Sequence, residues 1–173
     1  YPFAEVLTRD DNFGIGCFSR HPLISSRTVY LGQALVPSVV ATVSVGGRPL
    51  TIFGTHSWSP AGPRRAALRD DQLEAVGEFL AQQDDPLMVL ADLNTTPWSP
   101  VFRRLLRRSG LRDSRIGFGL QPSWPTFFPL ALVPIDHCLV SPSVAVLNRH
   151  LGPFVGSDHF PVVIDVAVAP SST

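Results

Sequence analysis

Apolar residues along this chain either alternate with polar ones or run together over a few positions, and both patterns predict β-strands. The expected strands cover residues 15–19, 38–45, 49–55, 87–90, 135–140 and 162–168, and residues 144–155 are expected to form a strand with a turn. In the second of these strands, Val39, Ala41 and Val43 share one face. The Gly46-Gly47 pair that follows supplies a tight turn, so the second and third strands should form a hairpin.

Two segments show the apolar spacing of amphipathic helices instead, residues 64–82 and residues 100–109. Their apolar positions are Leu73, Val76, Leu80, Phe102, Leu105 and Leu106. Charged residues occupy the opposite faces, Pro86 follows the end of the first helix, and Gly110 ends the second. Strands therefore outnumber helices, and hairpins coexist with strand–helix–strand units, which favours an α+β or mixed-sheet layered fold.

Length and composition fit one domain, residues 1–173, with 45% hydrophobic content and no visible internal boundary. Basic and acidic residues number 14 each, so no overall charge marks a nucleic-acid or membrane binder. Cys17 and Cys138 lie in apolar runs, either as buried thiols or as a disulfide. No apolar run is long enough to span a bilayer. Since the chain starts at Tyr1 rather than Met, we expect a segment before it, and a targeting or membrane segment there leaves the cellular location open.

Polar residues gather where the expected strands end. Asp92 and Asn94 follow the strand 87–90, and an acid and an amide two positions apart can share one side of the backbone. Such a pair can hold a proton, a cation or an anion at the edge of a sheet. Taken alone, the pair is more typical of an Asx-turn, in which the side chains bond their own backbone.

Asp136 lies inside an apolar strand, where an ionised carboxylate is costly unless it has a partner. His137 is a poor partner, because adjacent residues of a strand point to opposite faces. His56 and His159, which also lie at strand ends, are better candidates. An Asp–His pair holds one imidazole tautomer and stabilises its charged form, as a general base or a phosphate-binding imidazole requires. Asp158, beside His159, remains free to bind a hard cation.

Several motifs along the chain, taken in order, resemble the endonuclease/exonuclease/phosphatase superfamily. They are Asn12-Phe13-Gly14-Ile15, Ser19-Arg20-His21-Pro22, Gly54-Thr55-His56, Asp92-x-Asn94, Ile135-Asp136-His137 and Ser157-Asp158-His159-x-Pro161. This metal-dependent group includes DNase I-like nucleases, AP endonucleases, sphingomyelinases and inositol polyphosphate phosphatases. The resemblance implies a DNase I-like four-layer α/β/β/α sandwich and a water attack on a phosphoester, with Mg2+ or Mn2+, one or two ions, offsetting charge on the phosphoryl oxygens.

The same resemblance implies a role for each polar residue. Asp92 corresponds to the acid that handles a proton at the nucleophile or leaving group, and Asp136 to the carboxylate that orients the catalytic His159. The remaining three residues correspond to groups that touch the metal or the substrate. Asp158 matches the metal-linked carboxylate, Asn94 the amide that positions phosphate or water, and His56 a second histidine that contacts a phosphate oxygen.

One departure from the family pattern limits these expectations. The family carries an Asn on its opening strand and a Glu that is the main metal ligand, and neither motif is found here: Glu5 lacks the expected surroundings, and Glu74 and Glu78 lie on the first helix. We therefore expect residues 1–173 to be the C-terminal portion of the domain, its N-terminal part missing. This portion should bind metal weakly and have little phosphodiesterase activity.

The alternative function is a non-catalytic module that keeps the fold and binds phosphate or other anions. Five arginines on and after the second helix motivate it, Arg103, Arg104, Arg107, Arg108 and Arg112, although a solvated helix face is the simpler explanation for them. For the enzyme, nucleic acid, phospholipid and small phosphodiesters are all candidate substrates, and no obligate protein partner is evident. Four aromatic residues are expected to form a substrate-facing rim or to pack internally: Trp58, Trp124, Phe127 and Phe128.

Overall fold

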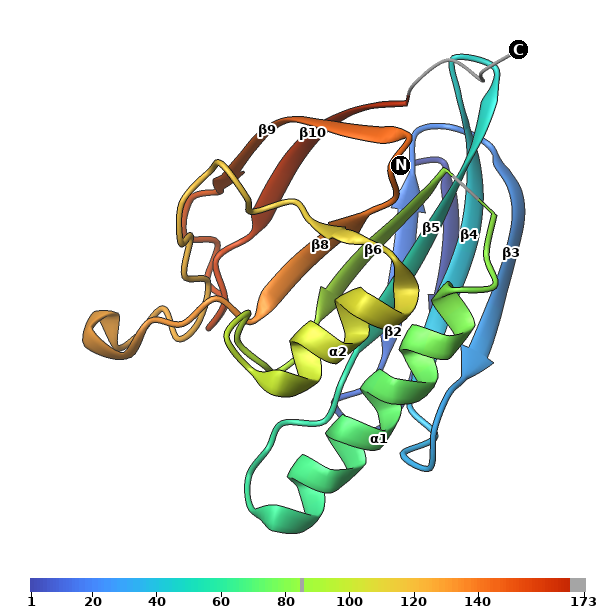
Figure 1. Ribbon diagram of the computed structural model, residues 1–173. Helices are drawn as coiled ribbons and strands as arrows, with labels where there is room; N and C mark the ends of the chain where they lie inside the picture. The colour runs from blue at the N-terminus through green and yellow to red at the C-terminus, as the bar shows by residue number, and fades with distance from the viewer. Residues whose placement is uncertain (85, 169–173) are drawn as a thin grey trace.

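The fold is known from a computed structural model, which describes residues 1–84 and 86–168. A six-stranded sheet with the order β3-β4-β5-β6-β8-β7 forms its centre, two helices lie on one face, and two hairpins lie on the other (Figure 1). The strands are β1 Phe3–Leu7, β2 Ile15–Ser19, β3 Leu23–Tyr30, β4 Pro37–Val45, β5 Arg48–His56, β6 Leu87–Asp92, β7 Arg112–Asp113, β8 Asp136–Val140, β9 Val144–Leu151 and β10 Val162–Val168. The helices are α1 Pro63–Leu80, α2 Pro100–Ser109 and the short 3-10 helix η1 Pro129–Ala131.

The central sheet is mixed. β3, β4 and β5 are consecutive antiparallel strands, whereas β5 and β6 run parallel and are joined through α1. β8 then pairs antiparallel with β6 on one side and with β7 on the other. As a result, the C-terminal ends of β5 and β6 and the start of β8 meet at one edge of the sheet.

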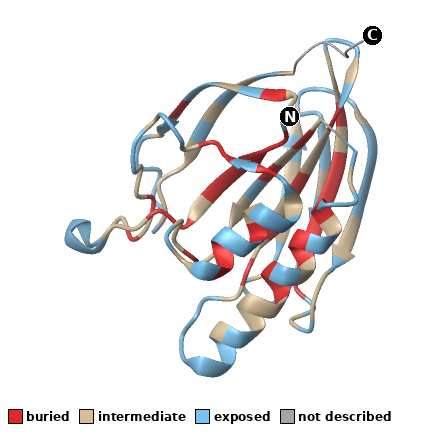
Figure 2. Ribbon diagram, in the orientation of Figure 1, coloured by how far each residue is buried: buried red, intermediate tan, exposed pale blue. Residues whose placement is uncertain are grey.

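The main core lies between this sheet and the two helices. Phe53 and Val89 from the sheet, Leu73 from α1 and Phe102 from α2 are almost fully buried there, and Figure 2 shows the buried faces of sheet and helices turned toward each other. Both helices begin with a proline, whose fixed φ suits the first helical turn. α2 ends at Gly110 with φ 70°, a left-handed conformation that glycine adopts without steric cost. Burial of the apolar stripe thus fixes both helices on this face.

The opposite face of the sheet is covered only in part. A smaller core, which includes Leu50 and Cys138, forms where β9 and β10 pack on it, and β2 packs against β4 and β5. Leu90, in the middle of the sheet on β6, keeps 41% of its surface exposed. The described residues therefore provide a helix layer, a complete sheet and parts of a second sheet, which confirms the predicted fold class.

The structure also shows which elements the sequence pattern missed. β1, β3 and β7 were not expected. β3 is an edge strand with a mixed polar sequence and mostly exposed side chains, so it lacks an apolar alternation. Within the segment 144–155, which was expected to be a strand with a turn, the strand β9 covers Val144–Leu151. Cys17 and Cys138 are free thiols, the first half-buried and the second buried, so the disulfide alternative was wrong. Among the described helices, none has the length and apolar character needed to cross a membrane.

Candidate active site

Three of the predicted site residues form a row across adjacent strands. His56, the last residue of β5, lies opposite Asp92, the last residue of β6, and Asp92 lies opposite Asp136, the first residue of β8. Residues that face each other across a ladder point to the same side of the sheet. Here that side is the one without helices, where all three side chains line one cavity.

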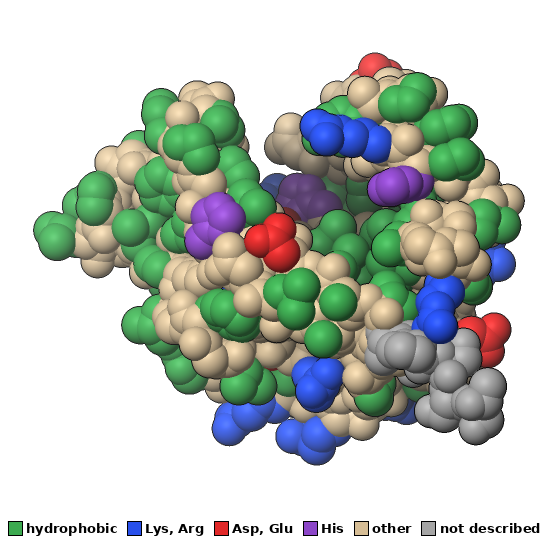
Figure 3. Space-filling view, turned by 90° about the horizontal axis from the view of Figure 1, so that it is seen from above, with side chains coloured by type: hydrophobic (Ala, Val, Ile, Leu, Met, Phe, Trp, Pro, Cys, Tyr) green, Lys and Arg blue, Asp and Glu red, His purple; other side chains and the backbone are tan. Residues whose placement is uncertain are grey.

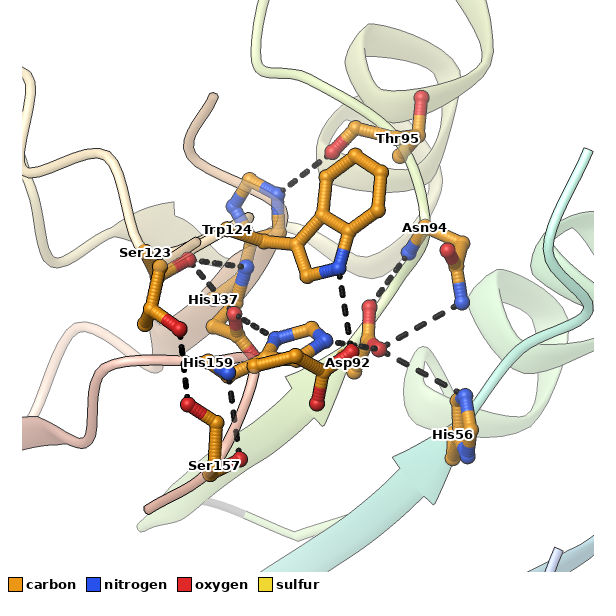
Figure 4. A network of polar contacts seen from close by, with 12 residues as sticks. His56, Asp92, Asn94, Thr95, Ser123, Trp124, His137, Ser157 and His159 are labelled. Atoms are coloured by element: carbon orange, nitrogen blue, oxygen red, sulfur yellow. Dashed lines mark hydrogen bonds and ion pairs between the residues drawn. The ribbon is translucent and has the colours of Figure 1, made fainter. Parts of the chain in front are cut away.

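The carboxylate of Asp136 holds the imidazole of His159. Asp136 Oδ2 lies 2.7 Å from His159 Nδ1, and the Ser123 hydroxyl donates a second hydrogen bond of 2.6 Å to the same oxygen (Figure 4). The hydrogen bond to Asp136 raises the pKa of His159 above its ordinary value. With Nδ1 engaged in this way, Nε2 is the ring nitrogen left for chemistry, and it lies 3.9 Å from Asp92 Oδ2. The predicted Asp–His pair therefore exists, with His159 as its partner.

Asp92 is the carboxylate at the centre of the row. Its Oδ2 lies 3.5 Å from His56 Nε2 as well as near His159. Burial, followed by the nearby charge of Asp136, raises the pKa of Asp92 to about 7. A carboxyl group with such a pKa can both accept and release a proton near neutral pH. This is the property that an acid at a nucleophile or leaving group requires.

His56 completes the row on the other side of Asp92. Burial, and then the positive charge of His159, lowers its pKa below the ordinary value. The Phe13 ring packs 5.3 Å from the imidazole, and the Trp58 ring packs 4.8 Å from Phe13. Trp58 thus packs on Phe13, and His56 presents its imidazole beside Asp92.

Asn94 is held in place from several directions. Its backbone N–H donates to Asp92 Oδ1 over 2.9 Å, which is the Asx-turn considered for this sequence, and its φ is 45°. Its side-chain amide donates to the Ser57 carbonyl over 2.9 Å, and the Asn94 backbone carbonyl accepts from the Arg69 guanidinium over 2.6 Å. The turn and the site are therefore one structure, because the turn places the amide beside the Asp92 carboxylate.

Asp158 lies at the exposed edge of the site. It accepts a hydrogen bond of 3.3 Å from the Trp124 indole, whose ring lies 6.3 Å from the His159 ring. The described residues whose donor atoms gather within 4.8 Å of one another are Asp92, Asp136 and His159, so Asp158 is outside this group.

A divalent cation fits part of this donor set. Asp92 and Asp136 are the carboxylates of the described group whose donor atoms lie within 4.8 Å of one another, and Asp136 Oδ2 is also shared by Ser123 and His159. Oxygen donors of this kind suit Mg2+ or Mn2+. Two carboxylates and one imidazole make a sparse site.

His137 faces the other side of the sheet, as its position after Asp136 predicted. Its Nε2 lies 2.8 Å from the Thr95 carbonyl, and its ring packs 4.4 Å from the Phe102 ring in the main core. Burial lowers the pKa of His137 to about 4, so the imidazole is neutral at physiological pH. His137 is a core residue and not part of the site.

Two further residues position Asp136, and neither could be recognised from a pattern along the chain. Ser123 is fully buried and lies in a loop, where a serine is unremarkable. Arg149 is also buried; it donates to the Asp136 carbonyl over 3.3 Å and to Ser114 over 3.1 Å, and its guanidinium contacts the Gln121 side chain. Both contacts depend on how the loop and β9 fold back to β8, and no spacing along the chain encodes that.

The cavity next to the row has a volume of about 590 Å3 and separates the central sheet from the two hairpins. Its floor includes Ile52 and Leu90 from the sheet, while Ile15 of β2 and Ile164 of β10 lie on its two sides. Figure 3 shows the molecule hollowed between two lobes, with histidine side chains in and beside the hollow. The site therefore opens into a largely apolar cleft with its polar groups at one end.

Removing the Ser123 hydroxyl should weaken the site without removing a reacting group. For Ser123→Ala we expect phosphoester hydrolysis to slow about tenfold at unchanged KM, because the lost hydrogen bond lets Asp136 and His159 rotate. Ser123→Thr keeps the hydroxyl and should retain the rate. Steady-state kinetics with bis-p-nitrophenyl phosphate measure this, and a Ser123→Ala protein as fast as the unchanged chain would show that the hydroxyl is dispensable.

The chain is similar to known proteins in both sequence and structure. The sequence model of the endonuclease/exonuclease/phosphatase family matches residues 1–159. An endonuclease/exonuclease/phosphatase from Beutenbergia cavernae has 23% sequence identity and a TM-score of 0.73, covering 90% of this chain and 48% of its own. The chain thus spans about half the length of that protein.

Other solved structures are similar over nearly the whole chain. The human Nocturnin catalytic domain with bound sulfate has 19% identity and a TM-score of 0.73, covering 96% of this chain and 72% of its own. A mannosyl-6-phosphatase from Bacteroides thetaiotaomicron has 17% identity and a TM-score of 0.66, covering 96% of this chain and 78% of its own. No curated protein sequence matches the chain. At these identities the structures show a shared fold.

Proposed function

The chain belongs to the endonuclease/exonuclease/phosphatase family, and from this premise we propose that it supplies the acid–base part of a metal-dependent phosphoesterase site. The observation that carries the proposal is the contact of Asp136 with His159 Nδ1 over 2.7 Å, with Asp92 beside the other ring nitrogen. This arrangement supports hydrolysis of a phosphoester by attack of water. The similarity to a mannosyl-6-phosphatase supports this reaction class and leaves the substrate open.

In the proposed reaction each residue handles a proton or a charge. Asp92, whose pKa is raised to about 7, accepts a proton from the attacking water or donates one to the leaving oxygen. His159, kept cationic to higher pH by Asp136, stabilises negative charge on the phosphoryl oxygens through its Nε2–H. Asp136 stays hydrogen-bonded throughout and fixes the tautomer.

The remaining predicted residues would hold the substrate and the cation. We propose that His56 and the Asn94 amide contact phosphate oxygens, because both lie beside Asp92 at the edge of the sheet. Asp92 and Asp158 would hold a divalent cation, which supplies charge neutralisation at the phosphoryl group. Asp136 is committed to His159 and contributes orientation instead.

The proposal is tested by hydrolysis and metal binding of residues 1–173. We expect slow, Mg2+- or Mn2+-dependent hydrolysis of bis-p-nitrophenyl phosphate and a metal Kd on the order of 1 mM or weaker, because two carboxylates are a sparse ligand set. Isothermal titration and absorbance assays measure both. Complete absence of metal-dependent turnover would count against the phosphoesterase. Robust turnover that is lost in Asp158→Ala would instead overturn the expectation of weak binding.

The alternative of an anion-binding module has less structural support. Two of its five arginines are engaged on the helix face, where Arg104 lies 3.3 Å from Glu74 and Arg108 lies 2.6 Å from Glu78. These pairs join α2 to α1, on the side of the sheet away from the row of His56, Asp92 and Asp136. The arginines are therefore used at least in part to pair the two helices, and we rank the enzyme first.

A further inference from the structure

A stretch of 20 residues between Arg115 and Asp136 carries no charged side chain. Residues 116–135 contain no Asp, Glu, Lys, Arg or His; the other stretch of this length without them, residues 28–47, lies largely in β3 and β4. In the structure this stretch forms loops and the short helix η1, and it includes the segment that projects furthest from the body in Figure 1. An uncharged segment that is also exposed is unusual on a protein surface.

The projecting part is an apolar loop, residues 125–132, closed at its base by a bridge between Trp124 and Val133. Its large apolar side chains point into solvent: Leu130 is 91% exposed, Phe127 75% and Phe128 51%. Of the two alternatives for Phe127 and Phe128, internal packing is therefore wrong, because both side chains are exposed. Figure 3 shows hydrophobic side chains at the end of the corresponding lobe.

The base of the apolar loop is fastened to the site. Thr126 donates from its backbone N–H to the Asp158 carbonyl over 2.9 Å and from its hydroxyl to the Ser157 carbonyl over 2.8 Å. Trp124 donates to the Asp158 carboxylate, and Ser123 donates to Asp136. A surface that binds the tip of this loop would therefore lie beside the site, at a fixed distance from it.

The shape and chemistry of the apolar loop fit a lipid bilayer better than a protein. The loop is convex and apolar, and it has no charged group that could fix an orientation against a folded partner. Phe and Leu side chains at the tip, with a Trp at the base, match the segments that enter the boundary between headgroups and acyl chains. A fluid bilayer accepts such a tip without needing a complementary pocket.

We propose that the apolar loop docks this protein onto a membrane surface by inserting Phe127, Phe128 and Leu130, so that the site faces the headgroup layer. The substrate class that follows is a phosphoester carried by a lipid, and this part rests on the proposed phosphoesterase function. The docking itself does not depend on that function. Since the loop is uncharged, binding is expected to occur on neutral phosphatidylcholine and to persist at high salt.

Vesicle co-sedimentation tests the docking. The unchanged chain should bind phosphatidylcholine vesicles at ionic strengths of about 0.15 M and about 1 M alike. Phe127→Ser with Leu130→Ser should lower the partition coefficient at least about tenfold, because two apolar side chains are lost from the bilayer. The matched control is Ile24→Ser with Tyr30→Ser, which changes two exposed side chains of β3 and should leave binding unaltered. A Leu130→Trp variant should show a blue shift of its added fluorescence with vesicles.

The outcomes separate this inference from the proposed function. If the loop variant binds vesicles as well as the control does, or if about 1 M salt releases the protein, docking by the loop is overturned. If analytical ultracentrifugation shows a dimer that the loop variant abolishes, the loop serves a second copy and the inference is also wrong. Hydrolysis of soluble bis-p-nitrophenyl phosphate should be equal in the loop variant and the control, so a failure of catalysis is seen independently of vesicle binding.

Discussion

Replacing His159 with alanine is expected to slow metal-dependent hydrolysis of bis-p-nitrophenyl phosphate by about 10²- to 10⁴-fold, the contribution typical of a positioned acid–base group. The imidazole is held by Asp136 over 2.7 Å and presents Nε2 toward Asp92, so its removal takes away the proposed charge-stabilising group beside that carboxylate. KM should change less than kcat, because the loss falls mainly on the transition state. Steady-state kinetics at saturating Mn2+ measure the effect.

The control for this experiment is His150→Ala. His150 is exposed on β9, where its imidazole lies near Asn148, and it has no contact with the row of His56, Asp92 and Asp136. The control protein should hydrolyse the substrate at the rate of the unchanged chain. Equal rates for His159→Ala and the control would remove His159 from the mechanism, and with it the observation that carries the proposed function.

Replacing Asp92 with asparagine should make the protein more stable, by about 2 kcal/mol above pH 7, while abolishing hydrolysis. Burial and the neighbouring Asp136 carboxylate raise the pKa of Asp92 to about 7, so the folded state disfavours the charged form. An unfolded aspartate ionises near its ordinary pKa of 3.8. The carboxylate therefore contributes stability below about pH 4, and this contribution is lost as the pH rises through about 7. Asparagine keeps the shape and the acceptor for Asn94 without the charge.

Urea unfolding in EDTA at about pH 8 and about pH 4 measures this difference, since the two proteins should be equally stable in acid and should diverge at the higher pH. Asp165→Asn serves as the comparison, because that carboxylate is exposed on β10 and its replacement should give no such gain. A gain that is the same at both pH values would mean that charge at Asp92 is not its cause. The ionised Asp92 carboxylate would then not lower the free energy of unfolding, and the site would show no trade-off between stability and activity.

The sequence predicted the main sheet well because burial imposes a readable pattern. Phe102 and Leu105 gave α2 its correct bounds, and the Gly46-Gly47 pair marked the hairpin of β4 and β5. β3 escaped prediction because an edge strand buries little and needs no alternation. Nothing in Ser25 or Ser26, for example, distinguishes a strand from a loop; their structure comes from the ladder with β4.

The site was predictable only where a burial argument applied. Asp136 in an apolar strand required a partner, and excluding His137 by strand geometry left His56 and His159, of which the structure has His159. Asp92 was ambiguous between a turn and a site, and it belongs to both. Ser123 and Arg149 could not be found, because their contacts with Asp136 join segments whose approach is set by tertiary packing alone.

The row of His56, Asp92 and Asp136 has a consequence for how this fold can diversify. The three residues are locked into one register by the pairing of β5, β6 and β8, so none can be moved without displacing the others. The loop that carries Trp124 and the apolar tip is joined to this row at its base, where the Ser123 hydroxyl donates to Asp136. In the proposed scheme the reaction and the membrane docking are carried by separate segments, so we expect an exchange of the loop between homologues to change the surface that is bound and to leave the reaction unchanged.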